Sequence, residues 1–157
     1  MTESDLSGRV ALVTGASRGI GAATALRLAE AGADVAVGCG QHREAAEEIA
    51  GKITGLGRRA VVVSGDMADP DVPRRIIAET AERLGPVDIL VANAGTGTPG
   101  LIATDMLLGD PRLDALERSV PVGRLGQPAE VADLIVAARN AYMTGQTVSV
   151  DGGRYPR

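Results

Sequence analysis

Thr14-Gly15-Ala16-Ser17-Arg18-Gly19-Ile20-Gly21 is the stretch that decides the fold of this 157-residue chain. An apolar run, Val10 to Val13, precedes it, and a run rich in Ala and Leu, Ala22 to Ala31, follows it. A glycine-rich turn from a strand into a helix lets the backbone approach a diphosphate, and the free N–H groups at the helix start favour negative charge. The stretch therefore predicts a phosphate-binding turn. The alternative is an ordinary tight turn, with a small residue where a helix packs closely on a sheet.

Apolar runs alternate with helical patterns through the first 95 residues. Runs without polar alternation are typical of strands that are covered on both faces of a parallel sheet. The expected strands are Arg9–Thr14, Asp34–Gly38, Ala60–Ser64 and Val87–Asn93, with helices over 19–31, 42–56 and 71–84. Short loops and right-handed crossovers give the strand order 3-2-1-4. We therefore predict an α/β fold with a doubly wound, Rossmann-like parallel sheet whose adenine-binding half, residues 1–95, is complete.

The pattern changes after the fourth expected strand. A loop over 94–100 leads to a short amphipathic piece over 101–108, and helices are expected within 111–120 and over 129–138. Thr147 to Val150 is expected to form a last short strand. We treat residues 1–157 as a single domain, in which residues 96–157 follow the fourth strand directly.

Composition excludes several classes of function. The net charge is −4 with a pI near 5.0, and the 16 Lys and Arg residues are spread along the chain, which argues against nucleic acid as a partner. No run approaches the roughly 18 apolar residues that span a bilayer, and the first residues do not form a signal peptide. We expect no membrane partner and a cytoplasmic location. Cys39 is the single cysteine, so we expect no intrachain disulfide and no metal site.

The glycine spacing Thr-Gly-x-x-x-Gly-x-Gly resembles that of the short-chain dehydrogenase/reductase family. Within that family, the sequence Gly-Ala-Ser-Arg-Gly-Ile-Gly is most similar to the 3-oxoacyl-(acyl-carrier-protein) reductase branch. Other stretches resemble family motifs in the family's own order. They are Asp66-Met67 after the third strand, Asn93-Ala94-Gly95 at the end of the fourth, the Pro-Gly loop 99–106, and the C-terminal segments 121–132, 144–146 and 150–153.

The resemblance implies hydride transfer between NADPH and a ketone, with a 3-oxoacyl thioester as one candidate substrate. It also implies that the protein acts on a small-molecule substrate and forms a homo-oligomer. The diphosphate and 2′-phosphate would be held by Gly15, Ser17, Arg18, Gly19, Ile20 and Gly21. The adenine would meet Asp66 and Met67, the ribose Asn93, Ala94 and Gly95, and the nicotinamide side Ile102 and Thr104.

The residues after the second strand favour NADP over NAD. NAD enzymes usually place Asp or Glu about 20 residues beyond the glycine turn, where it binds the ribose 2′-hydroxyl. The stretch Gly38-Cys39-Gly40-Gln41-His42-Arg43 has no carboxylate to repel a 2′-phosphate. Arg18 can offer a forked, permanently charged set of donors, to which Arg43 or His42 can add. The alternative is that both arginines are solvated residues at helix starts.

The catalytic residues cannot be assigned. In the family that the chain resembles, a long segment between the Asn-Ala-Gly motif and the Pro-Gly loop carries the catalytic Ser, Tyr and Lys. Here three residues separate Gly95 from Pro99. Lys52 is the only lysine, and Gln146 stands four residues after Tyr142, so the sequence contains no Tyr-x-x-x-Lys pair. The nicotinamide-binding half is therefore truncated, and the fourth strand should become an exposed apolar edge.

Three explanations for this gap are open. The sequence could come from a longer protein, with the residues of an internal segment left out of it. It could instead carry a true internal deletion. A third explanation is that the protein is a noncatalytic nucleotide binder. The first hypothesis for function is an NADP-dependent reductase. Its rivals are a noncatalytic NADP(H)-binding module and, more remotely, a scaffold that no longer binds nucleotide.

Overall fold

The computed structural model describes residues 5–95, 101–137 and 148–153. Four parallel strands form one sheet in the order β3-β2-β1-β4. The strands are β1 (Val10–Val13), β2 (Asp34–Cys39), β3 (Ala60–Ser64) and β4 (Ile89–Val91), and the helices between them are α1 (Gly19–Glu30), α2 (Arg43–Gly55) and α3 (Val72–Arg83). The predicted strand order and the predicted alternation of strands and helices are confirmed.

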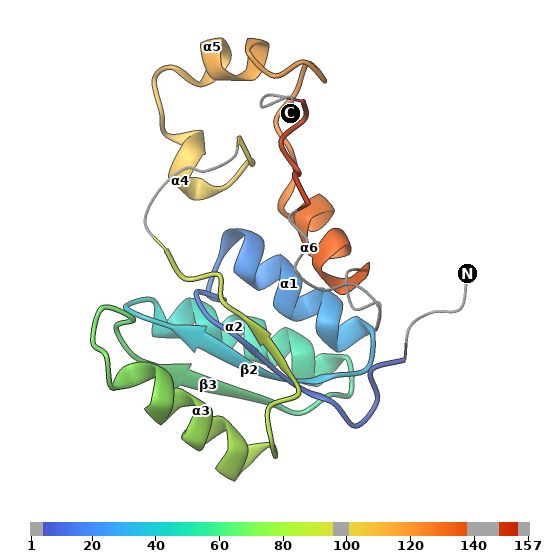
Figure 1. The fold of residues 1–157 in the computed structure, drawn as a ribbon, viewed down its shortest axis with the longest axis vertical. Helices are drawn as coiled ribbons and strands as arrows, with labels where there is room; N and C mark the ends of the chain where they lie inside the picture. Colours follow the sequence, from blue (N-terminus) through green and yellow to red (C-terminus); the bar gives the residue numbers. More distant parts are fainter. Residues whose placement is uncertain (1–4, 96–100, 138–147, 154–157) are drawn as a thin grey trace.

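The direction of the connections explains how the helices are distributed (Figure 1). From β1 the chain steps through β2 to β3, which places α1 and α2 on one face of the sheet. It then crosses back over β1 to reach β4, so α3 covers the opposite face. The crossing leaves a switch point between β1 and β4, where sheets of this kind bind their ligands beyond the carboxyl ends of the strands.

Side chains from β1 enter two separate cores. Ala11 and Val13 lie in the apolar cluster beneath α1 and α2, whereas Val10 and Leu12 lie in the cluster beneath α3. Neighbouring side chains of a strand point to opposite faces, so an uninterrupted apolar run is what a sheet covered on both faces requires. This explains why the run Val10–Val13 lacks polar alternation.

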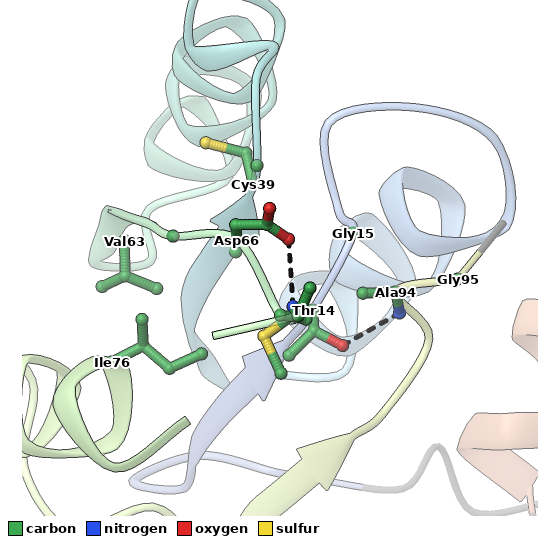
Figure 2. Close-up of a pocket in the computed structure, with 13 residues that line it drawn as sticks. Thr14, Gly15, Cys39, Val63, Asp66, Ile76, Ala94 and Gly95 are labelled. Atoms are coloured by element: carbon green, nitrogen blue, oxygen red, sulfur yellow. Dashed lines mark hydrogen bonds between the residues drawn. The ribbon is translucent and has the colours of Figure 1, made fainter. Parts of the chain in front are cut away.

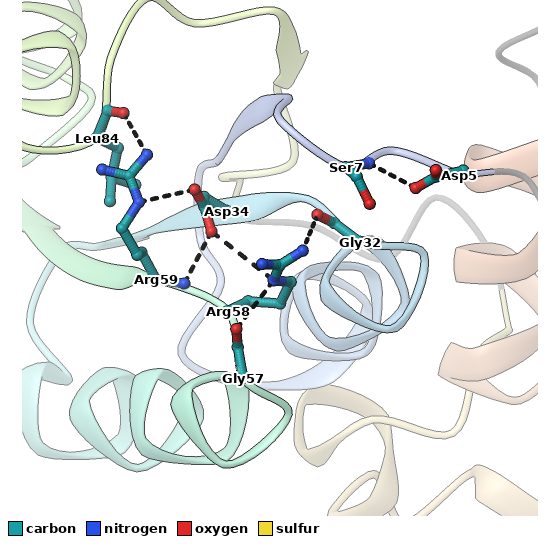
Figure 3. A network of polar contacts seen from close by, with 8 residues as sticks. All are labelled: Asp5, Ser7, Gly32, Asp34, Gly57, Arg58, Arg59 and Leu84. Atoms are coloured by element: carbon teal, nitrogen blue, oxygen red, sulfur yellow. Dashed lines mark hydrogen bonds and ion pairs between the residues drawn. The ribbon is translucent and has the colours of Figure 1, made fainter.

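A polar network joins elements at the amino ends of the strands (Figure 3). The buried carboxylate of Asp34 accepts hydrogen bonds from the backbone N–H and the Nε of Arg59, each at 2.8 Å. Arg59 also donates to the carbonyl of Leu84 at 2.7 Å, and Arg58 donates to the carbonyl of Gly32 at 3.0 Å. Burial opposes ionisation of Asp34. The two hydrogen bonds from Arg59, together with the charges of Arg59 and Arg58, nevertheless lower the pKa of Asp34.

Strand β4 is shorter than the sequence predicts. The expected strand was Val87–Asn93, but the ladder covers Ile89–Val91 and, within the described residues, pairs with β1 alone. The preceding residue, Asp88, instead binds the backbone N–H of Val10 through its side chain at 2.9 Å. Leu90 is 55% exposed, as expected for an apolar edge strand.

The C-terminal part is built around a small apolar cluster of its own. Its helices are α4 (Asp105–Leu108), α5 (Leu113–Arg118) and α6 (Pro128–Ala137). The cluster consists of Leu101, Leu107, Val120 and Leu125, with three partly buried neighbours. Helix α6 lies beside α1 (Figure 1), and an ion pair between Arg27 and Asp133 joins the two helices.

The prediction of a last strand over 147–150 is wrong for residues 148–150, which form no strand, and Thr147 lies outside the described residues. In the described structure the sheet consists of β3, β2, β1 and β4, and none of these strands pairs with residues 148–150. Val122 donates its backbone N–H to the carbonyl of Gly152 at 3.2 Å, so this end of the chain contacts the segment before α6. Among the described helices, none is both long and apolar enough to cross a membrane.

Candidate nucleotide-binding site

The glycine turn between β1 and α1 has the geometry of a cradle. Gly15 and Gly19 have φ values of +64° and +58°, which side chains with a Cβ rarely adopt. A Cβ on Gly21 would lie 2.2 Å from the carbonyl oxygen of Gly15, so the first turn of the helix packs directly on the loop. Arg18 is the N-cap residue of α1 and makes no side-chain cap hydrogen bond. Nothing in the described chain therefore caps this helix start, which suits an anion.

Thr14 and Asn93 fasten the cradle to the end of β4. The Thr14 hydroxyl accepts hydrogen bonds from the backbone N–H groups of Asn93 and Ala94, each at 3.0 Å. The side-chain amide of Asn93 donates to the carbonyl oxygens of Thr14 at 3.0 Å and Gly15 at 3.2 Å. The Asn-Ala-Gly motif thus fixes the path of the glycine turn across the switch point.

A pocket of about 310 Å³ opens beside the cradle, at the carboxyl ends of the strands (Figure 2). Five residues assigned from the resemblance line it: Gly15, Asp66, Met67, Ala94 and Gly95. The two residues assigned to the adenine and two of the three assigned to the ribose therefore line one cavity, whereas Asn93 is not among the lining residues. The remaining lining residues are Thr14, Gly38, Cys39, Gly40, Val63, Gly65, Ala68 and Ile76.

Those remaining lining residues were missed as site residues. A Cβ on Gly38 would lie 2.8 Å from the carbonyl oxygen of Val13, so small size at the end of β2 keeps the neighbouring strands close. Gly65 is similarly confined, because a Cβ there would lie 2.4 Å from Cγ1 of Val72. The signal in the sequence was a glycine at or directly after the ends of the second and third expected strands, which indicates close packing at this edge of the sheet.

Asp66 forms a turn and also lines the pocket. Its Oδ1 accepts a hydrogen bond from the backbone N–H of Ala68 at 3.0 Å, as a turn-forming aspartate does. It also lines the pocket, and Figure 2 shows its carboxylate facing the cavity. A turn role therefore holds the carboxylate in place without removing it from the site.

Arg43 stands near the same cavity, at the start of α2. Its Nη1 donates to the hydroxyl of Ser64 at 3.1 Å, and its Nε pairs with Glu47 at 2.9 Å. Ser64 in turn lies 3.3 Å from the sulfur of Cys39, a residue of the pocket lining. The guanidinium is held over the ends of β2 and β3 and is exposed.

The other predicted residues lie around the cradle. Ser17, Gly19 and Ile20 are half-buried in the turn and the start of α1, and Arg18 is exposed. Thr104 comes from the C-terminal part, yet its Cγ2 would lie 3.2 Å from a Cβ on Gly19. Ile102 is buried, and a Cβ on Gly126 would lie 2.6 Å from its Cδ1.

No catalytic pair is assembled in the described structure. Lys52 lies on the outer side of α2, exposed to solvent. The two tyrosines of the chain, Tyr142 and Tyr155, both lie outside the described residues. The part of the chain that the structure describes thus presents a glycine cradle and a pocket without an assignable proton donor.

Residues 9–108 match the family described as short chain dehydrogenase. The chain is 37% identical over 145 residues to versicolorin reductase stcU of Emericella nidulans, covering 90% of this chain and 50% of that protein. It is 47% identical over 90 residues to versicolorin reductase 1 of Aspergillus parasiticus, covering 57% of this chain and 34% of that protein. The chain thus spans between a third and a half of the length of these relatives.

Solved structures agree with the sequence relatives. A short-chain type dehydrogenase/reductase from Mycobacterium marinum superposes with a TM-score of 0.88 at 26% identity, covering 98% of each chain. A short chain dehydrogenase from Burkholderia cenocepacia, in complex with NADP, gives a TM-score of 0.89 at 25% identity, covering 95% of this chain and 98% of that one. The family match covers more than half of the present sequence. The chain therefore belongs to the short-chain dehydrogenase family.

Proposed function

We propose that this protein binds NADP(H) in the glycine cradle and the adjoining pocket, as an NADP-dependent oxidoreductase that exchanges hydride between NADPH and a ketone. The observation that carries the proposal is the cradle itself. Gly15 and Gly19 have the positive φ values that the turn requires, and a Cβ on Gly21 would lie 2.2 Å from the carbonyl oxygen of Gly15, so the turn packs tightly on the uncapped first turn of α1. A diphosphate fits this combination of free N–H groups and close backbone.

The pocket supports placing the adenosine end beside the cradle. Asp66 offers a carboxylate as an acceptor for the adenine amino group, and Met67 offers an apolar side chain for the ring. Ala94 and Gly95 offer backbone against the ribose. The NADP complex of the Burkholderia cenocepacia relative supports a nicotinamide dinucleotide as the cofactor class.

Two exposed arginines support NADP rather than NAD. Arg18 lies within the cradle, and Arg43 lies at the rim of the pocket over Ser64. No carboxylate occupies residues 38–43 to repel a 2′-phosphate. We expect Arg18→Ala to weaken NADPH binding about tenfold and NADH binding very little, because the guanidinium pairs with the extra phosphate. Arg118→Ala removes an exposed arginine of α5 and serves as the matched control.

The bound cofactor would supply the hydride, and the described residues would bind and orient it. The substrate is a small ketone under this proposal, with a 3-oxoacyl thioester as one candidate, and the protein works as a homo-oligomer. Reductases among the relatives support reduction as the reaction.

A noncatalytic NADP(H)-binding module is the second candidate. The observation that favours it is the absence of any Tyr-x-x-x-Lys pair from the sequence, since reduction of a ketone needs a positioned acid to protonate the alkoxide. A calorimetric titration with NADPH, followed by loss of NADPH absorbance with a panel of ketones, separates the two. Binding with turnover supports the reductase, and binding without turnover supports the module. Affinity too weak to measure at millimolar NADPH would contradict both.

The mass of the purified polypeptide decides how a reductase could work. A mass of 16.0 kDa means that the family's catalytic segment is absent and that protonation must come from elsewhere. A substantially heavier protein would carry residues beyond this sequence, and the family mechanism would be available to it.

A further inference from the structure

The loop that carries Ile102 and Thr104 is held by a contact outside the pocket. Its backbone forms a parallel bridge with the segment before α6: Ala103 donates to the carbonyl of Gly126 at 2.8 Å, and Gly126 donates to that of Leu101 at 3.0 Å. Close packing of Ile102 against Gly126 supports the same pairing. Whatever fixes residues 124–127 therefore also fixes the loop.

An ion pair fixes those residues. Arg124 makes a bidentate contact with Glu130, with Nη1–Oε2 and Nη2–Oε1 distances of 2.9 and 2.7 Å. The same Nη1 donates to the carbonyl of Leu125 at 3.0 Å, and Glu130 accepts the backbone N–H of Gln127 at 2.7 Å. Glu130 thus accepts a backbone N–H at the start of α6 while it holds the arginine.

The charge state of Glu130 is consistent with this arrangement. Hydrogen bonds from the Arg124 side chain and the Gln127 backbone lower the pKa of Glu130 to about 2. The carboxylate is therefore ionised throughout the physiological pH range. The pair is partly exposed, so its value lies in orienting backbone more than in burying charge.

At its far end the loop meets the cradle. Thr104 packs on Gly19, the first residue of α1, so a displacement of the loop moves Thr104 relative to the diphosphate-binding turn. The adenine pocket has no lining residue from the C-terminal part. The two ends of a bound dinucleotide would therefore depend differently on the loop.

We propose that Arg124 and Glu130 are positioning residues for the cofactor: through the 101–103 and 125–126 bridge they hold Thr104 against the cradle, and so contribute to affinity for the nicotinamide end of NADPH. This inference rests on the proposed function. It makes the C-terminal ion pair a support of the ligand site rather than an isolated surface contact.

Two ligands test it by calorimetric titration: NADPH, and 2′,5′-ADP, which carries the adenosine end without the nicotinamide. The wild-type protein binds NADPH more tightly than 2′,5′-ADP. Arg124→Ala and Glu130→Gln each weaken NADPH binding about fivefold and change 2′,5′-ADP binding by less than about twofold. Arg124→Lys, which keeps the charge but not the fork, restores part of the loss.

Arg112→Ala is the matched control, because Arg112 makes a bidentate contact with Asp110 and, in the described structure, no hydrogen bond with either segment of the bridge. Both of its affinities stay at the wild-type values. Equal weakening of both ligands in Arg124→Ala would overturn the inference, because it indicates a general structural loss, and unchanged affinities would overturn it too. Equal wild-type affinities for the two ligands would overturn it while leaving binding of the adenosine end intact. A wild-type protein that binds neither ligand contradicts the proposed function itself.

Discussion

The two parts of this chain, residues 5–95 and the described residues after 100, are stabilised in different ways. The first part buries a parallel sheet between two apolar clusters, and β1 and β2 are buried along their whole length. The second part has short helices, four buried side chains in one small cluster, and exposed ion pairs. Its contacts with the first part run through α6 against α1 and Thr104 against Gly19. The lining of the pocket therefore comes from the first part alone, whereas the second part contacts the cradle through Thr104.

Core truncation should reveal this difference most strongly. Leu12 is fully buried in the sheet, and Leu12→Ala should lower the free energy of unfolding by about 2 to 5 kcal/mol, from lost burial and a residual cavity. Leu125→Ala, in the small C-terminal cluster, should cost less than about 2 kcal/mol, because that cluster can open locally while the sheet remains folded. Urea denaturation followed by far-UV circular dichroism measures both. Equal losses would mean that the two parts unfold as one cooperative unit.

A substitution in the cradle should separate the site from the stability of the helices. Gly21→Ala places a Cβ 2.2 Å from the Gly15 carbonyl oxygen and 2.5 Å from Nδ2 of Asn93, so the turn must shift. We expect a loss of about 1 to 3 kcal/mol in the free energy of unfolding and loss of measurable NADPH binding. Thermal melts and calorimetric titration measure the two effects.

Gly51→Ala supplies the matched control for that substitution. Gly51 lies within α2, and a Cβ there would meet nothing within 4 Å. The alanine should raise the free energy of unfolding by about 0.5 to 1 kcal/mol through helix propensity, with NADPH binding unchanged. Intact binding in Gly21→Ala would show that the cradle does not approach a ligand as closely as proposed.

The sequence predicted the first part far better than the second, for a physical reason. Buried strands such as Val10–Val13 owe their state to local apolar runs, which a single sequence shows directly. The ends of β4 depended instead on a distant contact, the side chain of Asp88 on the backbone of Val10. The expected strand over 147–150 likewise needed a neighbouring strand, and no strand of the described structure pairs with residues 148–150.

The residues of the candidate site also divide into those that local sequence predicts and those that depend on distant contacts. Asp66, Ala94 and Gly95 could be assigned because motifs place them after strands, and the structure brings them into one pocket. Gly38 and Gly65 were missed because their role depends on which backbone or side chain lies opposite, and spacing alone does not show this. The contact of Thr104 with Gly19 joins residues far apart in sequence, so only the folded chain reveals how the loop reaches the cradle.

The smallest effect concerns the amino edge of the sheet, where Asp34→Asn should cost about 1 to 2 kcal/mol at pH 7 through weaker hydrogen bonds to Arg59. Folding lowers the pKa of Asp34, so its contribution is complete above the unfolded-state value of about 3.9 and disappears as the pH falls through the folded-state value. The difference between wild type and Asp34→Asn in urea midpoints should therefore be constant from pH 7 to about pH 5 and shrink in more acidic solution.

Asp110→Asn is the control from the second part. The pKa of Asp110 lies at about 2 because of Arg112, but these partners are two residues apart and the arginine is exposed, so the pair can persist in the unfolded chain and should affect stability less. If Asp110→Asn were as destabilising as Asp34→Asn, the local ion pairs of the C-terminal part would stabilise the fold as strongly as the contacts that join strands.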